Sequence, residues 1–590
     1  MVINMKIKEM LGALQLNRKD NDSNKQLMTI WGENFNSDKV LEEYPRPQLV
    51  RDNYTILNGK YKYAFTKSSK MPEKYDGEIL VPFSPETVMS GVGRQLQPNE
   101  FLWYERNIEL NEIPNDKRII LHIGACDERC RVYVNGAQVG HHSGGYQAFS
   151  FDITSYVGIG NNKLQICVRD RSDTSYHGRG KQKLQNGGMF YTAQSGIWQT
   201  VWYEWVPDIY IKGLHITPLY DDDSVQIEFF TNETGDSDKT CSVKIYENDT
   251  VVSEWKGHSV RKLILPIPNK KSWSPVSPFL YQTEITYGED KVRSYFGMRH
   301  FSAEKDMDGI PRLCINHIPY FQKGILDQGY WPESLMTPVS DEAMIHDIET
   351  AKALGFNMIR KHCKIEPMRW YYHCDRLGML VWQDMINGGG EYNLIKTSYI
   401  PTVIKSMRGL KDDNYAFMAR KNPRGRREWK KECLETIEQL YNCPCICTWV
   451  LFNEGWGQFD AKENTQMVLE HDNTRIIDSH SGWFDQDAGD INSVHIYFFD
   501  LKAQIGKKPY VISEYGGLTY EVKDHTYSDN IYGYGNYHKL ADYHKAYSDM
   551  MKDIEKLYRD GLSAAVYTQL TDIEEEVNGV MTYDRKVIKI

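Results

Sequence analysis

The sequence has no uninterrupted apolar run of about 18 or more residues, so it offers no candidate transmembrane helix. Its first 22 residues mix charges among the apolar positions and lack a small-residue cleavage site, which predicts that no signal peptide is present. The chain has little excess of one charge over the other. It has 70 Lys and Arg and 80 Asp and Glu, a formal net charge of −10. This modest charge argues against nucleic acid or an anionic membrane as a partner.

Cysteine is sparse and follows no metal-binding pattern. The chain has 11 cysteines, an odd number, and several lie inside apolar strand-like runs, where a thiol packs as a small hydrophobic group. We therefore expect reduced thiols and a cytoplasmic location. Cys443, Cys445 and Cys447 are spaced two apart, with no second cysteine or histidine pair at zinc-finger spacing, so a metal site is disfavoured there.

The length of the chain predicts several domains. At about 100–200 residues per domain, 590 residues imply three or four, and the patterns indicate three. Residues 1–208 show short alternating runs separated by turn signals, typical of a β-sandwich. Residues 209–300 hold about seven short strands, the size of an immunoglobulin-like sandwich. In residues 301–590 strands alternate with helical segments, which predicts a C-terminal (β/α)8 barrel.

Eight apolar segments are the expected barrel strands. They are residues 319–326, 356–362, 379–385, 445–454, 475–480, 491–498, 510–516 and 563–572. Helices are expected at residues 341–355, 427–442 and 536–561, where apolar residues recur with a 3.6-residue period. Residues 386–422 have weak periodicity with many glycines and charges, which favours an active-site loop.

Two of the expected strands end in a glutamate. The run CICTWVLFNEGWG, from Cys445, ends in Asn453 and Glu454 before a glycine, and PYVISEYGG, from Pro509, reaches Glu514 before its glycines. Barrel enzymes keep their catalytic groups at these strand ends. Either glutamate alone is more often a helix cap or a surface ion pair, but the two together predict a carboxylate pair. Hydrolysis of a glycosidic bond is the commonest task of such a pair that needs no metal.

Both motifs resemble those of glycoside hydrolase family 2, which carries an Asn-Glu acid/base after the fourth barrel strand and a Glu-Tyr-Gly nucleophile after the seventh. Residues 195–199, SGIWQ, are similar to a phrase of the family's jelly-roll sugar-binding domain, which implies a jelly roll for residues 1–208. The resemblance implies a retaining reaction without cofactor: Glu514 attacks the anomeric carbon, and Glu454 protonates the leaving oxygen and later activates water. This division of labour needs carboxyl groups about 5–5.5 Å apart and pKa values shifted in opposite directions.

Other strand ends supply candidates for substrate binding. Arg360 and His362 are similar to the family's Arg-x-x-His segment, shortened by one residue; an Arg beneath a carboxylate would keep the nucleophile ionised, although a barrel-wall ion pair is the equal alternative. Asp327, after the first strand, is a candidate for hydroxyl recognition. The remaining candidates are Asn453 for the sugar 2-hydroxyl, Asp384, Trp483, His495, and, from family positions, Tyr497 beside the nucleophile and Tyr567 where the family commonly has a Trp under the sugar.

The sugar itself stays open at this stage. An exo-acting β-galactosidase is the first choice, because it is the family's commonest activity and no acid-recognising site is evident. Glucuronidases of the family carry an Asn-x-Lys signature near the barrel end, whereas the nearest stretch here, residues 578–580, reads Asn-Gly-Val. β-Mannosidase and arabinopyranosidase remain alternatives, and a non-catalytic carbohydrate-binding protein is the alternative from another class. The expected partner is an oligosaccharide or glycoside, and a homo-oligomer stays open.

Overall fold

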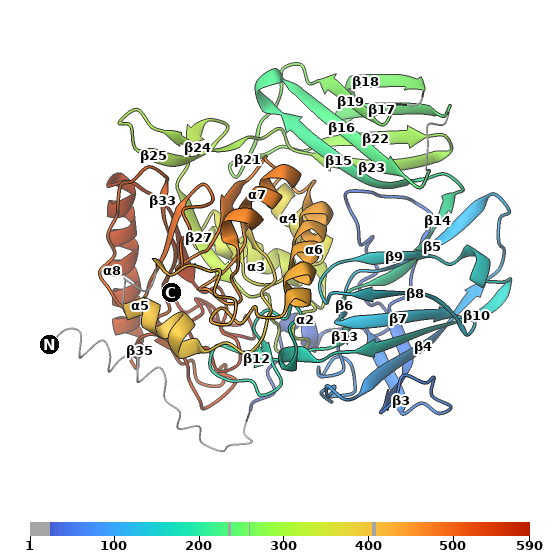
Figure 1. Ribbon diagram of the computed structural model, residues 1–590, viewed down its shortest axis with the longest axis horizontal. Helices are drawn as coiled ribbons and strands as arrows, with labels where there is room; N and C mark the ends of the chain where they lie inside the picture. The colour runs from blue at the N-terminus through green and yellow to red at the C-terminus, as the bar shows by residue number, and fades with distance from the viewer. Residues whose placement is uncertain (1–23, 234–237, 259, 404–408) are drawn as a thin grey trace.

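The computed structural model describes residues 24–233, 238–258, 260–403 and 409–590, and it has the predicted class: two β-sandwiches beside a C-terminal barrel (Figure 1). The prediction about a signal peptide concerns residues outside this description. No helix of the described chain is long and apolar enough to cross a membrane. All 11 cysteines are free and buried, as expected for small hydrophobic side chains.

The N-terminal sandwich packs a six-stranded sheet on a four-stranded one. Its strands alternate as the sequence predicts: in β7, Cys130, Val132 and Val134 are buried while the residues between them face outward. The six-stranded sheet has the order β3 (Gly77–Val81), β2 (Gly59–Thr66), β4 (Phe101–Leu110), β10 (Gly160–Arg169), β7 (Arg129–Val134), β8 (Ala137–Ser143). The four-stranded sheet has the order β1 (Tyr54–Ile56), β14 (Val201–Pro207), β5 (Lys117–Ile123), β9 (Phe149–Asp152).

The second sandwich has seven strands, as the immunoglobulin-like size predicts. One sheet is β15 (Ile211–Leu219), β16 (Ser224–Thr231), β19 (Lys262–Pro266), and the other is β18 (Thr250–His258), β17 (Thr240–Glu247), β22 (Tyr281–Tyr287), β23 (Asp290–Phe296). A 3-10 turn, η3 (Tyr220–Asp222), joins β15 to β16. The exact domain boundaries stay a prediction.

A small antiparallel sheet leads into the barrel. It consists of β24 (Phe301–Lys305), β25 (Pro311–Ile315) and β26 (Ile318–Pro319). Short elements elsewhere are α2 (Ile30–Glu33), β6 (Cys126–Asp127), η1 (Thr154–Tyr156), η2 (Ser172–Thr174), β11 (Gln182–Lys183), β12 (Tyr191–Thr192), β13 (Gly196–Ile197), β20 (Trp273–Ser274), β21 (Ser277–Pro278), β34 (Thr519–Tyr520) and β35 (Asn536–Tyr537).

The barrel has eight parallel strands, one in each predicted segment. They are β27 (Gln322–Asp327), β28 (Met358–Lys361), β29 (Leu380–Asp384), β30 (Ile446–Val450), β31 (Ile476–Asp478), β32 (Asn492–Ile496), β33 (Tyr510–Gly516) and β36 (Leu562–Thr568). Each pairs with its neighbours in chain order except β31 and β32, so the barrel is nearly closed. Every residue of β29, β30, β33 and β36 is buried, because parallel barrel strands are covered on both faces.

The three predicted helices are present and two more were missed. The predicted ones are α3 (Asp341–Ala353), α6 (Pro423–Leu440) and α8 (Leu540–Arg559), and the additional ones are α4 (Met368–Leu377) and α7 (Ala461–His471). Helix α3 begins where the Ser340 hydroxyl accepts the amide of Ala343 at 3.2 Å. Residues 479–491 and 497–509 form no helix, so the β/α alternation is interrupted on both sides of β32.

A segment of the N-terminal sandwich reaches across to the barrel. Gly178 forms a β-bridge with Gly388, and the Arg179 guanidinium donates to the Gly389 carbonyl oxygen at 2.6 Å. A side chain at Gly388 would lie 2.3 Å from the His177 carbonyl oxygen, so the approach requires glycine. The predicted loop at residues 386–422 thus joins two domains. It also contains a π turn, η4 (Ile395–Tyr399), and α5 (Ile400–Val403), while residues 404–408 lie outside the described chain.

Candidate active site

The two predicted glutamates meet at the C-terminal end of the barrel. A carboxylate oxygen of Glu454 and one of Glu514 lie within 4.8 Å of each other and of a ring nitrogen of His495. The His495 ring lies between them: Nδ1 is 2.9 Å from Glu454 Oε1, and Nε2 is 3.6 Å from Glu514 Oε1. The strand ends therefore bring together the carboxylate pair that the sequence predicts.

The backbone turns sharply where Glu454 leaves its strand. Glu454 has φ +50°, a left-handed conformation that is uncommon outside glycine, and its amide donates to the Ser481 carbonyl oxygen at 3.0 Å. Gly455 follows with φ +72°, and a Cβ there would lie 2.3 Å from the Phe484 ring. Backbone strain of this kind gathers at functional sites, because it aims a side chain that a regular strand would not.

Glu514 is held as a carboxylate by two donors. Arg360 Nη1 donates to Oε1 at 3.1 Å, and the Tyr497 hydroxyl donates to Oε2 at 2.5 Å. Burial of the side chain raises its pKa, but the neighbouring His495 and Arg360 outweigh that effect and lower the pKa to about 2. Glu514 is therefore ionised at neutral pH, the state in which a carboxylate acts as a nucleophile.

Arg360 connects Glu514 to further predicted residues. Its fully buried guanidinium donates to both oxygens of Asp384 at 3.0 Å and to Asn453 Oδ1 at 2.8 Å. Asp384 also accepts a hydrogen bond from His362 Nδ1 at 2.5 Å. Burial raises the pKa of Asp384, but the charge of Arg360 outweighs it and keeps the pKa low. Arg360, Asp384 and His362 thus form one hydrogen-bonded network that reaches Glu514.

Of two further predicted residues, Trp483 contacts His495, whereas Asp327 is paired with Lys361. The Trp483 ring packs edge-on against His495, with centroids 5.3 Å apart, so it supports the residue that lies between the two glutamates. Asp327 accepts from the Gly329 amide at 2.8 Å and pairs with Lys361. Both of its oxygens are engaged and the residue is 3% exposed, and its contact with a sugar hydroxyl stays a prediction.

The prediction that Tyr567 lies under the sugar is wrong. Its ring packs against Tyr547 of α8 at 5.3 Å and against Tyr515 at 5.6 Å, and it is fully buried. Successive residues of a strand face opposite sides, so the next residue, Thr568, faces the site and its hydroxyl lies 3.0 Å from that of Tyr497. Thr568 is the residue that the eighth strand contributes.

Lys181, from the N-terminal sandwich, was not predicted. It is 7% exposed, and its ammonium lies 5.7 Å from the ring centroids of Trp456 and Tyr191. Its ammonium forms no hydrogen bond or ion pair with the described part of the chain, where its contacts are with aromatic rings. The Trp456 ring also contacts that of His362, with centroids 6.5 Å apart, so the ammonium lies beside the site. The only hint in the sequence is its position shortly before SGIWQ, since family members often extend this domain toward the active site.

Comparison with known proteins agrees with this architecture. Residues 58–204 match the family model described as "Glycosyl hydrolases family 2, sugar binding domain", residues 209–299 match "Glycosyl hydrolases family 2", and residues 333–588 match "Glycosyl hydrolases family 2, TIM barrel domain". The chain belongs to glycoside hydrolase family 2. The family assigned from two short motifs therefore extends over all three domains.

Relatives within the family differ in their stated substrates. A β-galactosidase of Thermoanaerobacter pseudethanolicus is 22% identical over 502 residues, which are 82% of this chain and 62% of that protein. Two solved structures show the same fold at low identity. A β-D-glucuronidase of Dictyoglomus thermophilum has TM-score 0.71 and 18% identity, covering 92% of this chain and 96% of its own. A β-galacturonidase of Eisenbergiella tayi bound to galacturonate has TM-score 0.68 and 19% identity, with the same coverage.

Proposed function

We propose that this chain is a retaining exo-β-glycosidase that hydrolyses terminal β-linked sugars. The observation that carries the proposal is the approach of the Glu454 and Glu514 carboxylate oxygens to within 4.8 Å. Retaining enzymes hold their carboxyl groups about 5–5.5 Å apart, whereas inverting enzymes separate them by about 6.5–9.5 Å to admit a water molecule. The observed approach suits the first class.

Each step of the reaction has a group in place for it. Glu514, ionised and oriented by Arg360 and Tyr497, attacks the anomeric carbon, and Glu454 gives its proton to the leaving oxygen as that bond breaks. In the second step Glu454 removes a proton from water, which attacks the same carbon and releases Glu514. Arg360 holds Asn453, which we expect to bind the sugar 2-hydroxyl.

Two glycones are favoured by separate observations. A β-galactoside is the first choice, because the similar protein of T. pseudethanolicus is named a β-galactosidase. A β-uronide is the second. The buried Lys181 ammonium lies over the Trp456 ring, which also contacts His362, and it has no carboxylate partner among the described residues. A sugar carboxylate would supply that partner. The absence of the Asn-x-Lys signature from this chain excludes only one way of binding a sugar carboxylate.

A panel of nitrophenyl glycosides tests the proposal. We expect turnover of at least one β-linked member, with the β-anomer formed first when the reaction is followed by proton NMR. Failure to cleave any member while sugars still bind would support the non-catalytic carbohydrate-binding alternative.

Replacing Lys181 by Met should change the choice between uronides and neutral sugars. A hydrogen bond to a charged group contributes about 1.5–3 kcal/mol, so the ratio of kcat/KM for β-uronide over β-galactoside should fall about 10- to 100-fold. Lys183→Met is the matched control, since that ammonium lies over the Phe190 ring at 4.5 Å in the same segment. An unchanged ratio in Lys181→Met would show that the ammonium does not contact the glycone.

Tyr497→Phe should lower kcat about 10- to 100-fold and move the acid limb of kcat/KM to higher pH, because it removes a donor from the Glu514 carboxylate. The low pKa of Glu514 keeps its carboxylate ionised as the pH falls. Without the Tyr497 hydroxyl that pKa rises, so Glu514 becomes protonated at a higher pH. Tyr534→Phe is the control: its ring stacks on that of Tyr497 with centroids 4.3 Å apart, and its hydroxyl lies 3.3 Å from the Tyr532 hydroxyl. Equal pH profiles for the two variants would contradict the role of Tyr497.

A further inference from the structure

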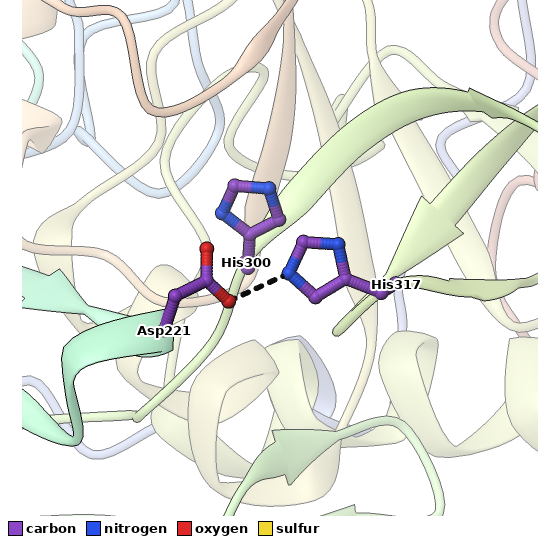
Figure 2. Close-up of side chains that lie close together, drawn as sticks. All are labelled: Asp221, His300 and His317. Atoms are coloured by element: carbon purple, nitrogen blue, oxygen red, sulfur yellow. Dashed lines mark hydrogen bonds and ion pairs between the residues drawn. The ribbon is translucent and has the colours of Figure 1, made fainter.

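A second cluster of metal-binding residue types lies where the immunoglobulin-like sandwich meets the barrel. Asp221 comes from η3, His300 follows β23, and His317 lies in the turn between β25 and β26 (Figure 2). One donor atom from each of the three lies within 4.8 Å of the others. Because β26 runs into the N-terminal end of β27, this cluster is at the end of the barrel opposite to the glutamate pair.

The His317 ring is oriented from both sides. Its Nδ1 lies 2.7 Å from Glu304 Oε1. Its Nε2 lies 2.8 Å from Asp221 Oδ1, the contact drawn as a dashed line in Figure 2. Metal-binding histidines commonly donate one ring N–H to a carboxylate, which directs the other nitrogen at the ion. Glu304 is in position to accept from Nδ1. His317 Nε2 and Asp221 would then bind the same ion.

His300 is held beside His317 by the backbone. The His300 amide donates to Asn316 Oδ1 at 2.8 Å, and the Asn316 amide donates to the His300 carbonyl oxygen at 2.8 Å. The two imidazole rings stack with centroids 4.5 Å apart. The His300 ring makes aromatic contacts but no hydrogen bond or ion pair within the described chain, so its nitrogens are available as ligands.

We propose that Asp221, His300 and His317 bind one divalent transition-metal ion of the zinc class, with Glu304 orienting His317. Two imidazoles and a carboxylate are a donor set that zinc accepts, with water as a fourth ligand. Bonds of about 2.0–2.1 Å put tetrahedral donors roughly 3.3–3.4 Å apart. The observed donors are within 4.8 Å, and rotation of the exposed Asp221 and His317 side chains can close the difference.

The bound ion would link the second sandwich to the segment that enters the barrel. Asp221 belongs to the second sandwich, whereas both histidines belong to the segment that enters the barrel. Asp221 and His317 are 66% and 41% exposed, so the ion can enter from solvent without domain opening. Binding to the folded state alone stabilises it, so the thermal unfolding temperature should rise with metal concentration.

Titration of the chelator-treated full-length protein with Zn²⁺, and with Co²⁺ followed by visible absorption, tests the proposal. We expect one saturable equivalent with a tetrahedral Co²⁺ spectrum. His300→Ala and His317→Ala should each weaken binding at least about 100-fold, and Glu304→Gln about 10- to 100-fold. His258→Ala is the matched control, because His258 is an exposed histidine paired with Asp238 in the same sandwich.

Two other clusters must be separated from this one. Glu454, His495 and Glu514, and likewise His362, Cys363 and Asp384, bring donors within 4.8 Å of one another. If the ion binds at Asp221, Glu454→Gln and Cys363→Ser should therefore still bind one equivalent of Zn²⁺ or Co²⁺. The proposal is overturned if the wild-type protein shows no saturable binding, or if His317→Ala binds as the wild type does.

Discussion

Glu514→Gln should lower kcat on an activated aryl glycoside by on the order of 10⁴-fold or more while the protein keeps its fold. The amide is nearly the same size as the carboxylate but is a poor nucleophile, so the covalent step is lost. The glutamine oxygen can still accept from Arg360, and its NH2 group can donate to the Tyr497 hydroxyl oxygen, which preserves the packing. Turnover and thermal unfolding measured on the same sample separate the two effects.

Glu463→Gln is the matched control for that substitution, since Glu463 lies exposed on α7 and should leave kcat unchanged. Retention of more than about a tenth of wild-type activity by Glu514→Gln would rule out covalent catalysis by this residue.

Glu454→Ala should affect substrates according to their leaving groups. An activated phenol departs without a proton, whereas a poor leaving group needs one, so the loss should be largest for natural glycosides and small for the first step on a dinitrophenyl glycoside. Release of the glycosyl-enzyme then becomes limiting, because no base activates water. Azide needs no base, so it should restore turnover and give a β-glycosyl azide.

The configuration of the azide product decides between mechanisms. Retention requires two displacements, the first by Glu514. An α-azide would mean that the azide attacks the face opposite the leaving group in a single step, as in an inverting enzyme with Glu514 as its base.

The sequence predicts the barrel well because its strands are buried on both faces and appear as continuous apolar runs. In β30, from Ile446 to Val450, every residue is buried, and the first polar residues after the run reach the site. Helix α7 was missed although Asp460 and, three residues later, Glu463 are the usual start signal in the sequence. In the structure Asp460 has a left-handed conformation and its side chain makes no capping hydrogen bond.

The face of a strand cannot be read reliably from sequence in a fully buried barrel. Tyr567 and Thr568 are both buried, and the pairing of β33 with β36 shifts register twice, so sequence alternation gives no basis for choosing between them.

Lys181 could not be predicted for another reason. It comes from a different domain, and only the packing of residues 170–199 on the barrel brings it beside His362.

The central claim is that Glu514 becomes covalently bound to the sugar during turnover. A 2-deoxy-2-fluoro β-glycoside with a dinitrophenyl leaving group, built on the glycone that the nitrophenyl panel selects, slows breakdown of that intermediate so that it accumulates. Peptide mass spectrometry should then find one glycosyl group per protein, on the peptide that contains Glu514. A label on another carboxylate, or complete turnover of the unfluorinated substrate with the α-anomer formed first, would contradict the claim.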